Sequence, residues 1–171
     1  MDSMKVLVIT DTIDEEFNKT IKSKYPDAVI LTPDEPIKPC LCCFNCWIGT
    51  PGVCVLNDGY RHLGKELSEC KKIIIISECF YGCFSPYIKN VIDRSIPYVL
   101  PLNKSKHRRS YKLMRYKNRF DCEVYLYGQN LTDDEKDTSN SLCESNAFFW
   151  KCKSLNVRFF EKFEEVARCG L

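Results

Sequence analysis

The stretch Lys72-Ile-Ile-Ile-Ile-Ser77 decides the fold that we predict for this chain. Its four successive isoleucines indicate a strand that is buried on both faces, because an unbroken apolar run is typical of a central strand in a parallel sheet. Lys5–Thr10 is a second run of this kind. The two runs together predict the centre of a parallel sheet.

Strand and helix patterns alternate on both sides of these runs. Further strands are predicted at Ala28–Leu31, Glu123–Tyr127 and Val157–Phe160. Helices are predicted at Thr12–Lys24, Asp58–Glu69, Pro86–Ile96 and Thr132–Lys151. This alternation favours a three-layer α/β sandwich with a five-stranded parallel sheet. The 171 residues contain no repeat and no linker, so one domain over residues 1–171 is expected.

Three loops are expected to carry the site, because ligands of such sheets bind beyond the carboxyl ends of the strands at the topological switch point. They follow Thr10, Ser77 and Tyr127. The residues between the second strand and Cys54 read as a loop, since Pro33, Pro36 and Pro39 interrupt regular structure. Because this loop leaves the second strand, we expect it at the same edge of the sheet.

Composition narrows the class of protein. The formal net charge of +2 argues against a general affinity for nucleic acid or membranes, and no apolar run reaches the length of a membrane span. The first residues lack the pattern of a signal peptide. Twelve cysteines without such a signal favour reduced thiols or metal ligands in the cytoplasm over a disulfide framework.

A compact group of cysteines lies in the long loop. Cys40, Cys43 and Cys46 follow one another at three-residue steps, and Cys54 comes after a turn. Thiolates at this spacing can converge on one metal ion or cluster. Three interpretations remain open from the spacing: a four-iron cluster, a structural zinc ion, or free thiols.

The first loop is acidic. Thr10-Asp-Thr-Ile-Asp-Glu-Glu16 contains no glycine, and Thr12 and Glu15 have the spacing of a capping box. Such a box uses the N–H groups that a bound phosphate needs, and the carboxylates repel an anion. We therefore predict a self-capped helix that does not bind phosphate in the usual way.

A basic stretch, Lys104–Arg119, contains no acidic residue. We interpret it as a solvated loop, which is the usual role of a charge run. The alternative is a segment that holds a phosphate-rich partner, either NADPH, a flavin phosphate across a dimer, or RNA. Nucleic acid is the least favoured of these partners.

Four stretches resemble the flavodoxin-like NAD(P)H-dependent FMN reductase and iron–sulfur flavoprotein family. They are Pro39-Cys-Leu-Cys-Cys-Phe-Asn-Cys-Trp47, Thr50-Pro-Gly-Val-Cys54, Tyr81-Gly-Cys-Phe-Ser-Pro86 and Lys89-Asn-Val-Ile-Asp-Arg-Ser95. The resemblance implies a flavodoxin-like fold with strand order 2-1-3-4-5, FMN at the switch point, NAD(P)H as reductant and commonly a homodimer. In the iron–sulfur branch a [4Fe-4S] cluster would be held by Cys40, Cys43, Cys46 and Cys54.

The resemblance also implies a set of cofactor-binding residues. The loop after the third strand would line the flavin ring, where Gly82 permits close approach and Phe80, Tyr81 and Phe84 can stack on it. The full set is Thr10, Thr12, Cys79, Phe80, Tyr81, Gly82, Cys83, Phe84, Ser85, Gly128, Gln129 and Asn130.

Two functions follow as expectations. The first is an FMN-dependent NAD(P)H oxidoreductase or electron-transfer flavoprotein that serves a small-molecule or small-protein acceptor. The second is a flavodoxin-fold protein that has lost FMN and uses its cysteines as a metal-binding or thiol-redox sensor. No residue pattern indicates a hydrolytic site.

Overall fold

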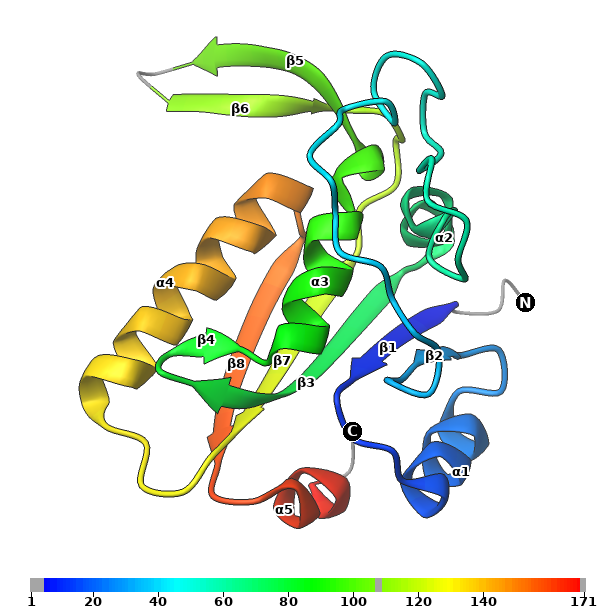
Figure 1. The fold of residues 1–171 in the computed structure, drawn as a ribbon. Coiled ribbons are helices and arrows are strands. Elements are labelled where there is room, and N and C mark those ends of the chain that lie inside the picture. Colours follow the sequence, from blue (N-terminus) through cyan, green and yellow to red (C-terminus); the bar gives the residue numbers. More distant parts are fainter. Residues whose placement is uncertain (1–4, 107–108, 170–171) are drawn as a thin grey trace.

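The computed structural model describes residues 5–106 and 109–169, and its core is a parallel sheet. The strands lie in the order β2-β1-β3-β7-β8, and each neighbouring pair is parallel. They are β1 (Val6–Thr10), β2 (Val29–Leu31), β3 (Lys72–Phe80), β7 (Asp121–Tyr127) and β8 (Ser154–Phe160). The predicted order 2-1-3-4-5 is therefore confirmed (Figure 1).

Helices cover both faces of the sheet. One face packs against α1 (Glu15–Lys24) and α5 (Phe163–Arg168), and the other against α2 (Leu63–Glu69), α3 (Pro86–Arg94) and α4 (Asp133–Trp150). Ile74 and Ile76 of β3 belong to the first layer, and Ile73 and Ile75 to the second. The expected burial of this strand on both faces is confirmed, because no more than 1% of any of the four side chains is exposed.

Helix α1 begins at Glu15, later than predicted, and its cap is a different residue. The Asp14 carboxylate is the N-cap and accepts a hydrogen bond from the Phe17 N–H at 2.9 Å. The predicted capping box is wrong, because the Thr12 N–H donates to Thr10 Oγ1 at 3.2 Å. Aspartate is at least as good an N-cap as threonine. Asp14, which lies closer than Thr12 to the first buried residue Phe17, therefore caps the helix. Self-capping of the helix is confirmed.

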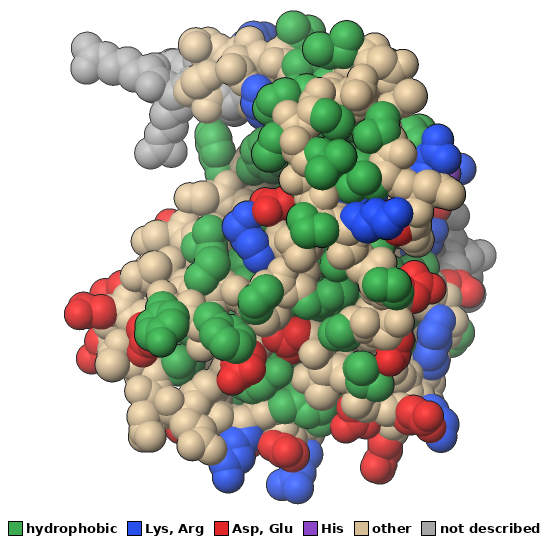
Figure 2. Space-filling view, viewed as in Figure 1, with side chains coloured by type: hydrophobic (Ala, Val, Ile, Leu, Met, Phe, Trp, Pro, Cys, Tyr) green, Lys and Arg blue, Asp and Glu red, His purple; other side chains and the backbone are tan. Residues whose placement is uncertain are grey.

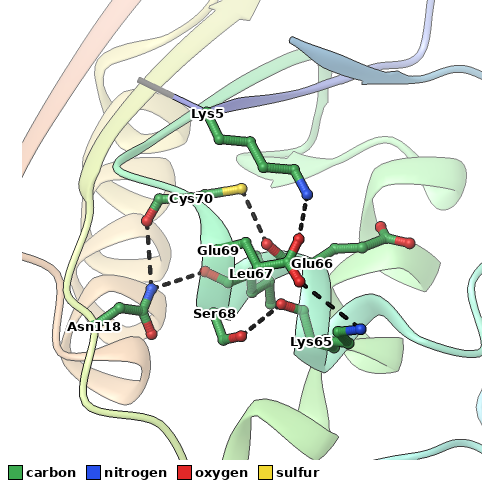
Figure 3. Close-up of polar contacts among 8 residues, drawn as sticks. All are labelled: Lys5, Lys65, Glu66, Leu67, Ser68, Glu69, Cys70 and Asn118. Atoms are coloured by element: carbon green, nitrogen blue, oxygen red, sulfur yellow. Dashed lines mark hydrogen bonds and ion pairs between the residues drawn. The ribbon is translucent and has the colours of Figure 1, made fainter. Parts of the chain in front are cut away.

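Helix α2 begins at Leu63 and not at Asp58, because the Asp58 carboxylate is taken by Arg94. The carboxyl end of α2 is fastened by Asn118, whose Nδ2 donates to the carbonyls of Leu67 at 2.9 Å and Cys70 at 3.3 Å (Figure 3). An ion pair between Lys5 and Glu69 adds a second attachment, next to the start of β1. These contacts set the position of α2 at the amino end of the sheet.

The basic stretch is a hairpin and not a loop, while Lys104, Ser105 and Ser110 are exposed, as expected of a solvated segment. Strands β5 (Val99–Lys106) and β6 (Arg109–Met114) pair antiparallel after a short 3-10 helix, η1 (Ile96–Tyr98). His107 and Arg108 lie outside the described residues. Apolar residues at the base account for the hairpin: Val99 pairs with Met114, and the ring of Tyr98 stacks on Tyr116 at 5.8 Å. Within residues 5–106 and 109–169, every helix is too short or too polar to span a membrane.

Candidate functional site

The two regions singled out by the sequence lie at opposite ends of α3. This helix begins at Pro86, beside the switch point, and ends at Arg94, beside the cysteines. Nine helical residues span about 13 Å. The expectation that the cysteines share an edge with the three loops is therefore wrong. The reason is the length of the connection from β2 to α2, which runs back past the sheet to its other end (Figure 1).

A pocket of about 760 Å³ lies beyond the carboxyl ends of β3, β7 and β8, next to the switch point between β1 and β3. Four of the predicted cofactor-binding residues line it, namely Cys79, Gly128, Gln129 and Asn130. Thr10 lies buried at the end of β1, and Thr12 lies beside it, where its Oγ1 is 3.1 Å from the hydroxyl of Tyr127. The structure thus gathers part of the predicted set at one place.

The remaining predicted residues form a small hairpin. Cys79 and Phe80 of β3 pair with Phe84 and Cys83 of β4 (Cys83–Phe84), and the turn between them is Tyr81-Gly82. Phe84 and Ser85 are buried, with 4% and 5% of their surfaces exposed. Tyr81 is 91% exposed and Phe80 is 42% exposed, so these two rings are accessible beside the strand ends.

Gly82 cannot be replaced without strain, and its substitution gives a first prediction. Its φ is +78°, and an added Cβ would lie 2.7 Å from Thr138 Cβ and 2.9 Å from the Glu135 carbonyl oxygen, both on α4. We expect Gly82→Ala to lower the free energy of unfolding by about 1–3 kcal/mol, measured by denaturant titration. The matched control is Gly49→Ala, where the new Cβ meets only the movable Asn45 side chain. Equal losses in the two variants would contradict the close packing of this turn on α4.

The charge of this strand-end pocket is negative. Glu78, Glu135, Glu161 and Glu164 line it, and Lys162 is the one basic lining residue within the described part of the chain. Acidic side chains lie over the lower half of the molecule in Figure 2, where the strands end, whereas apolar side chains gather at the top. The first loop, Thr10–Glu16, does not fit the phosphate of FMN either, because such a group needs free N–H donors and no opposing carboxylates.

The second region is the cysteine loop, defined as residues 40–54. All twelve cysteines of the chain are free thiols, and five of them line one narrow pocket of about 20 Å³ together with Arg94. The five are Cys40, Cys42, Cys43, Cys46 and Cys54. Cys46 is buried, Cys40 and Cys54 are half-buried, and Cys42 and Cys43 are exposed. The four predicted ligands and Cys42 are thus brought together.

Arg94 forms one wall of this pocket and is held by a buried ion pair. Its Nη1 and Nη2 each donate to a different oxygen of the Asp58 carboxylate at 2.7 Å, and Nη1 also donates to the Lys38 carbonyl. Cys54 lines the same pocket as the guanidinium. The Arg94 Nε has no hydrogen-bond partner among the described residues, so an unused buried donor stands beside the thiols.

The thiols differ in their acidity. Burial raises the pKa of Cys46 to about 11, and the nearby sulfurs of Cys54, Cys40 and Cys43 raise it further. Burial also raises the pKa of Cys40. Both thiols are therefore protonated at neutral pH.

The cysteines are near one another without forming a metal centre. Among the described residues, no group of three or more His, Cys, Asp or Glu side chains is arranged to hold a metal ion. The pocket of about 20 Å³ has room for roughly one water molecule. A four-iron cluster would require the loop to open.

Arg94 and Asp58 are the residues that sequence reasoning missed. Asp93 pairs with Lys89 on the same helix, whereas Arg94 reaches back to Asp58. No local pattern links two residues 36 positions apart.

The comparisons with known proteins concern the fold. No family model and no curated protein matches this chain. Among solved structures, it resembles an azoreductase from Bacillus anthracis str. Sterne, with a TM-score of 0.63 and 12% identity over 98% of this chain and 94% of the other. The chain has a flavodoxin-like fold.

Two further structures support this assignment. A putative quinone reductase from Klebsiella pneumoniae gives a TM-score of 0.61 at 11% identity, over 95% of this chain and 77% of the other. An FMN-dependent NADH-azoreductase from Bacillus anthracis str. Ames Ancestor, in complex with FMN, gives a TM-score of 0.56 at 12% identity, over 98% of this chain and 93% of the other. Function must therefore be argued from this chain's own residues.

Proposed function

We propose that this flavodoxin-fold chain is a thiol redox protein whose cysteine loop alternates between free thiols and a disulfide. The observation that carries the proposal is the single pocket lined by five thiols and Arg94. Exposed Cys42 and Cys43 give a reactant access, and buried Cys46 supplies a protonated thiol behind them. The Arg94 guanidinium lines the same pocket as Cys54, so a cation lies among the thiols of the loop.

The reaction is thiol–disulfide exchange with a low-molecular-weight disulfide. A loop thiolate attacks one sulfur of this oxidant, the disulfide bond breaks, and one small thiol leaves. A second loop thiol loses its proton and attacks the resulting mixed disulfide, which releases the second small thiol. Two protein thiols are thereby oxidised to one disulfide while the small disulfide is reduced to two thiols, and the reverse reaction restores the loop.

The test is a redox titration of the folded protein in mixtures of reduced and oxidised glutathione. Samples are quenched with an alkylating agent, and peptide mass spectrometry locates the disulfide. We expect one reversible disulfide between two cysteines of residues 40–54, formed before any of the buried core cysteines Cys70, Cys122 and Cys143 reacts.

A control separates the loop from cysteines in general. Cys169→Ser should leave the titration unchanged, because Cys169 follows α5 on the other layer, whereas removal of a paired loop cysteine should abolish it. The proposal is wrong if the loop thiols stay reduced throughout. It is also wrong if the isolated protein carries stoichiometric zinc or an iron–sulfur cluster that shields these thiols from alkylation.

An FMN-dependent NAD(P)H oxidoreductase is the second candidate function. It is favoured by the accessible rings of Phe80 and Tyr81 beside the strand ends and by the FMN-dependent azoreductase of similar fold. The acidic lining of the pocket stands against it. Flavin absorption in protein isolated without added cofactor, at one equivalent per chain, would favour this candidate over the thiol redox protein.

A further inference from the structure

Asp11 occupies the centre of the switch point. Its Oδ2 accepts a hydrogen bond from the Glu78 N–H at 2.8 Å, and its Oδ1 accepts one from the Tyr127 hydroxyl at 2.9 Å. Asp11 follows β1, Glu78 lies in β3, and Tyr127 ends β7. One carboxylate therefore ties together the ends of the three central strands, which is where a ligand of this fold would lie.

The neighbouring donors are also used within the chain. The Asp11 N–H donates to the Ile76 carbonyl at 3.3 Å, and the Thr12 N–H donates to Thr10 Oγ1. At the start of α1, the Phe17 N–H is taken by the Asp14 carboxylate. Three donors around the position of a phosphate, the N–H groups of Asp11, Thr12 and Phe17, are thus paired with the protein's own oxygens.

Tyr127 is held in its donating form. Burial raises the pKa of its hydroxyl well above the usual value, and the charge of Asp11 raises it further. The phenol therefore keeps its proton and donates it to Asp11 throughout the physiological range. The contact is a charge-assisted hydrogen bond, which is stronger than one between neutral groups.

We infer that Asp11 is an internal ligand that closes the switch point to phosphate-bearing cofactors. Its carboxylate takes the Glu78 N–H and the Tyr127 hydroxyl, and both of these residues also line the acidic pocket at the neighbouring strand ends. The inference is independent of the chemistry proposed for the cysteine loop, which lies at the far end of α3.

The test compares FMN with riboflavin, which has the same ring and no phosphate. Fluorescence titrations give the affinity of each flavin for the unmodified protein, Asp11→Asn and Asp11→Ser. In the unmodified protein, FMN should bind no more tightly than riboflavin. In Asp11→Ser the preference for FMN over riboflavin should rise at least about tenfold, because a competing charge is removed and two donors are freed.

Two controls keep the experiment decisive. Asp93→Asn removes a carboxylate from the exposed Lys89–Asp93 pair on α3 and should change neither affinity. Asp11→Asn keeps the shape of the side chain while losing its charge, so it gives the answer if the serine variant does not fold. The inference is overturned if the unmodified protein already prefers FMN about tenfold, if the preference is the same in all variants, or if no variant binds either flavin.

Discussion

Replacing Ile74 with alanine is expected to lower the free energy of unfolding by about 2–5 kcal/mol. The side chain is completely buried on β3, in the layer that contains Phe17 and Ile21 of α1. Alanine would lose the transfer free energy of the deleted methyl groups and leave a cavity that the neighbours only partly fill. The loss is a large share of the stability of a typical domain. The change in the free energy of unfolding is measured by guanidinium titration, followed by the fluorescence of Trp47 and Trp150.

The matched control is Ile74→Val, which deletes a single methylene group. It should cost about 0.5–1.5 kcal/mol, because the branched side chain still fills most of the space. If alanine costs no more than valine, the α1 side of β3 is loosely packed and the two-sided burial described here is wrong.

The sheet could be predicted because a strand that is buried on both faces has an unbroken run of apolar residues. Ile73–Ile76 admits no polar residue, since neither face of β3 reaches water. The helix starts were less predictable. Thr12 and Asp14 are both competent caps, and the choice depends on whether Thr10 and Tyr127 engage Thr12, which only the folded sheet determines.

Neither the hairpin nor the position of the cysteine loop could be predicted from the local sequence. Lysines and arginines mask the strand pattern of β5 and β6, whose pairing is fixed by the apolar base at Val99 and Met114. The cysteine spacing correctly indicated that the thiols gather. Their distance from the switch point follows from the long connection between β2 and α2, and the ion pair of Arg94 with Asp58 holds the loop at the far end of α3.

Replacing Asp58 with alanine is expected to cost about 3–5 kcal/mol in the free energy of unfolding, because it leaves the buried charge of Arg94 without its partner. The side chains of Asp58 and Arg94 are 6% and 0% exposed. Asp58 also accepts hydrogen bonds from the N–H groups of Lys38 and Tyr60, on both sides of the cysteine loop. The loop should loosen with the ion pair, and the alkylation of Cys46 should become faster than in the unmodified protein. Asp93→Ala is the control, since its exposed pair contributes little.

The same ion pair makes a prediction for pH. The hydrogen bonds from Arg94, and further those from the backbone, hold the pKa of Asp58 below its usual value. A carboxyl group of this kind stabilises the fold above its unfolded pKa of about 3.9, and the contribution is lost as pH falls through the lower folded value. The unmodified protein should therefore lose stability below about pH 4, and Asp58→Asn should remove part of that dependence while being less stable at neutral pH. Denaturant unfolding midpoints of both proteins, measured between pH 2 and pH 7 at steps of about one pH unit, would reveal this difference in pH dependence. Parallel curves for the two proteins would mean that other carboxyl groups govern the acid transition and that the Asp58–Arg94 pair does not set the stability of the cysteine loop.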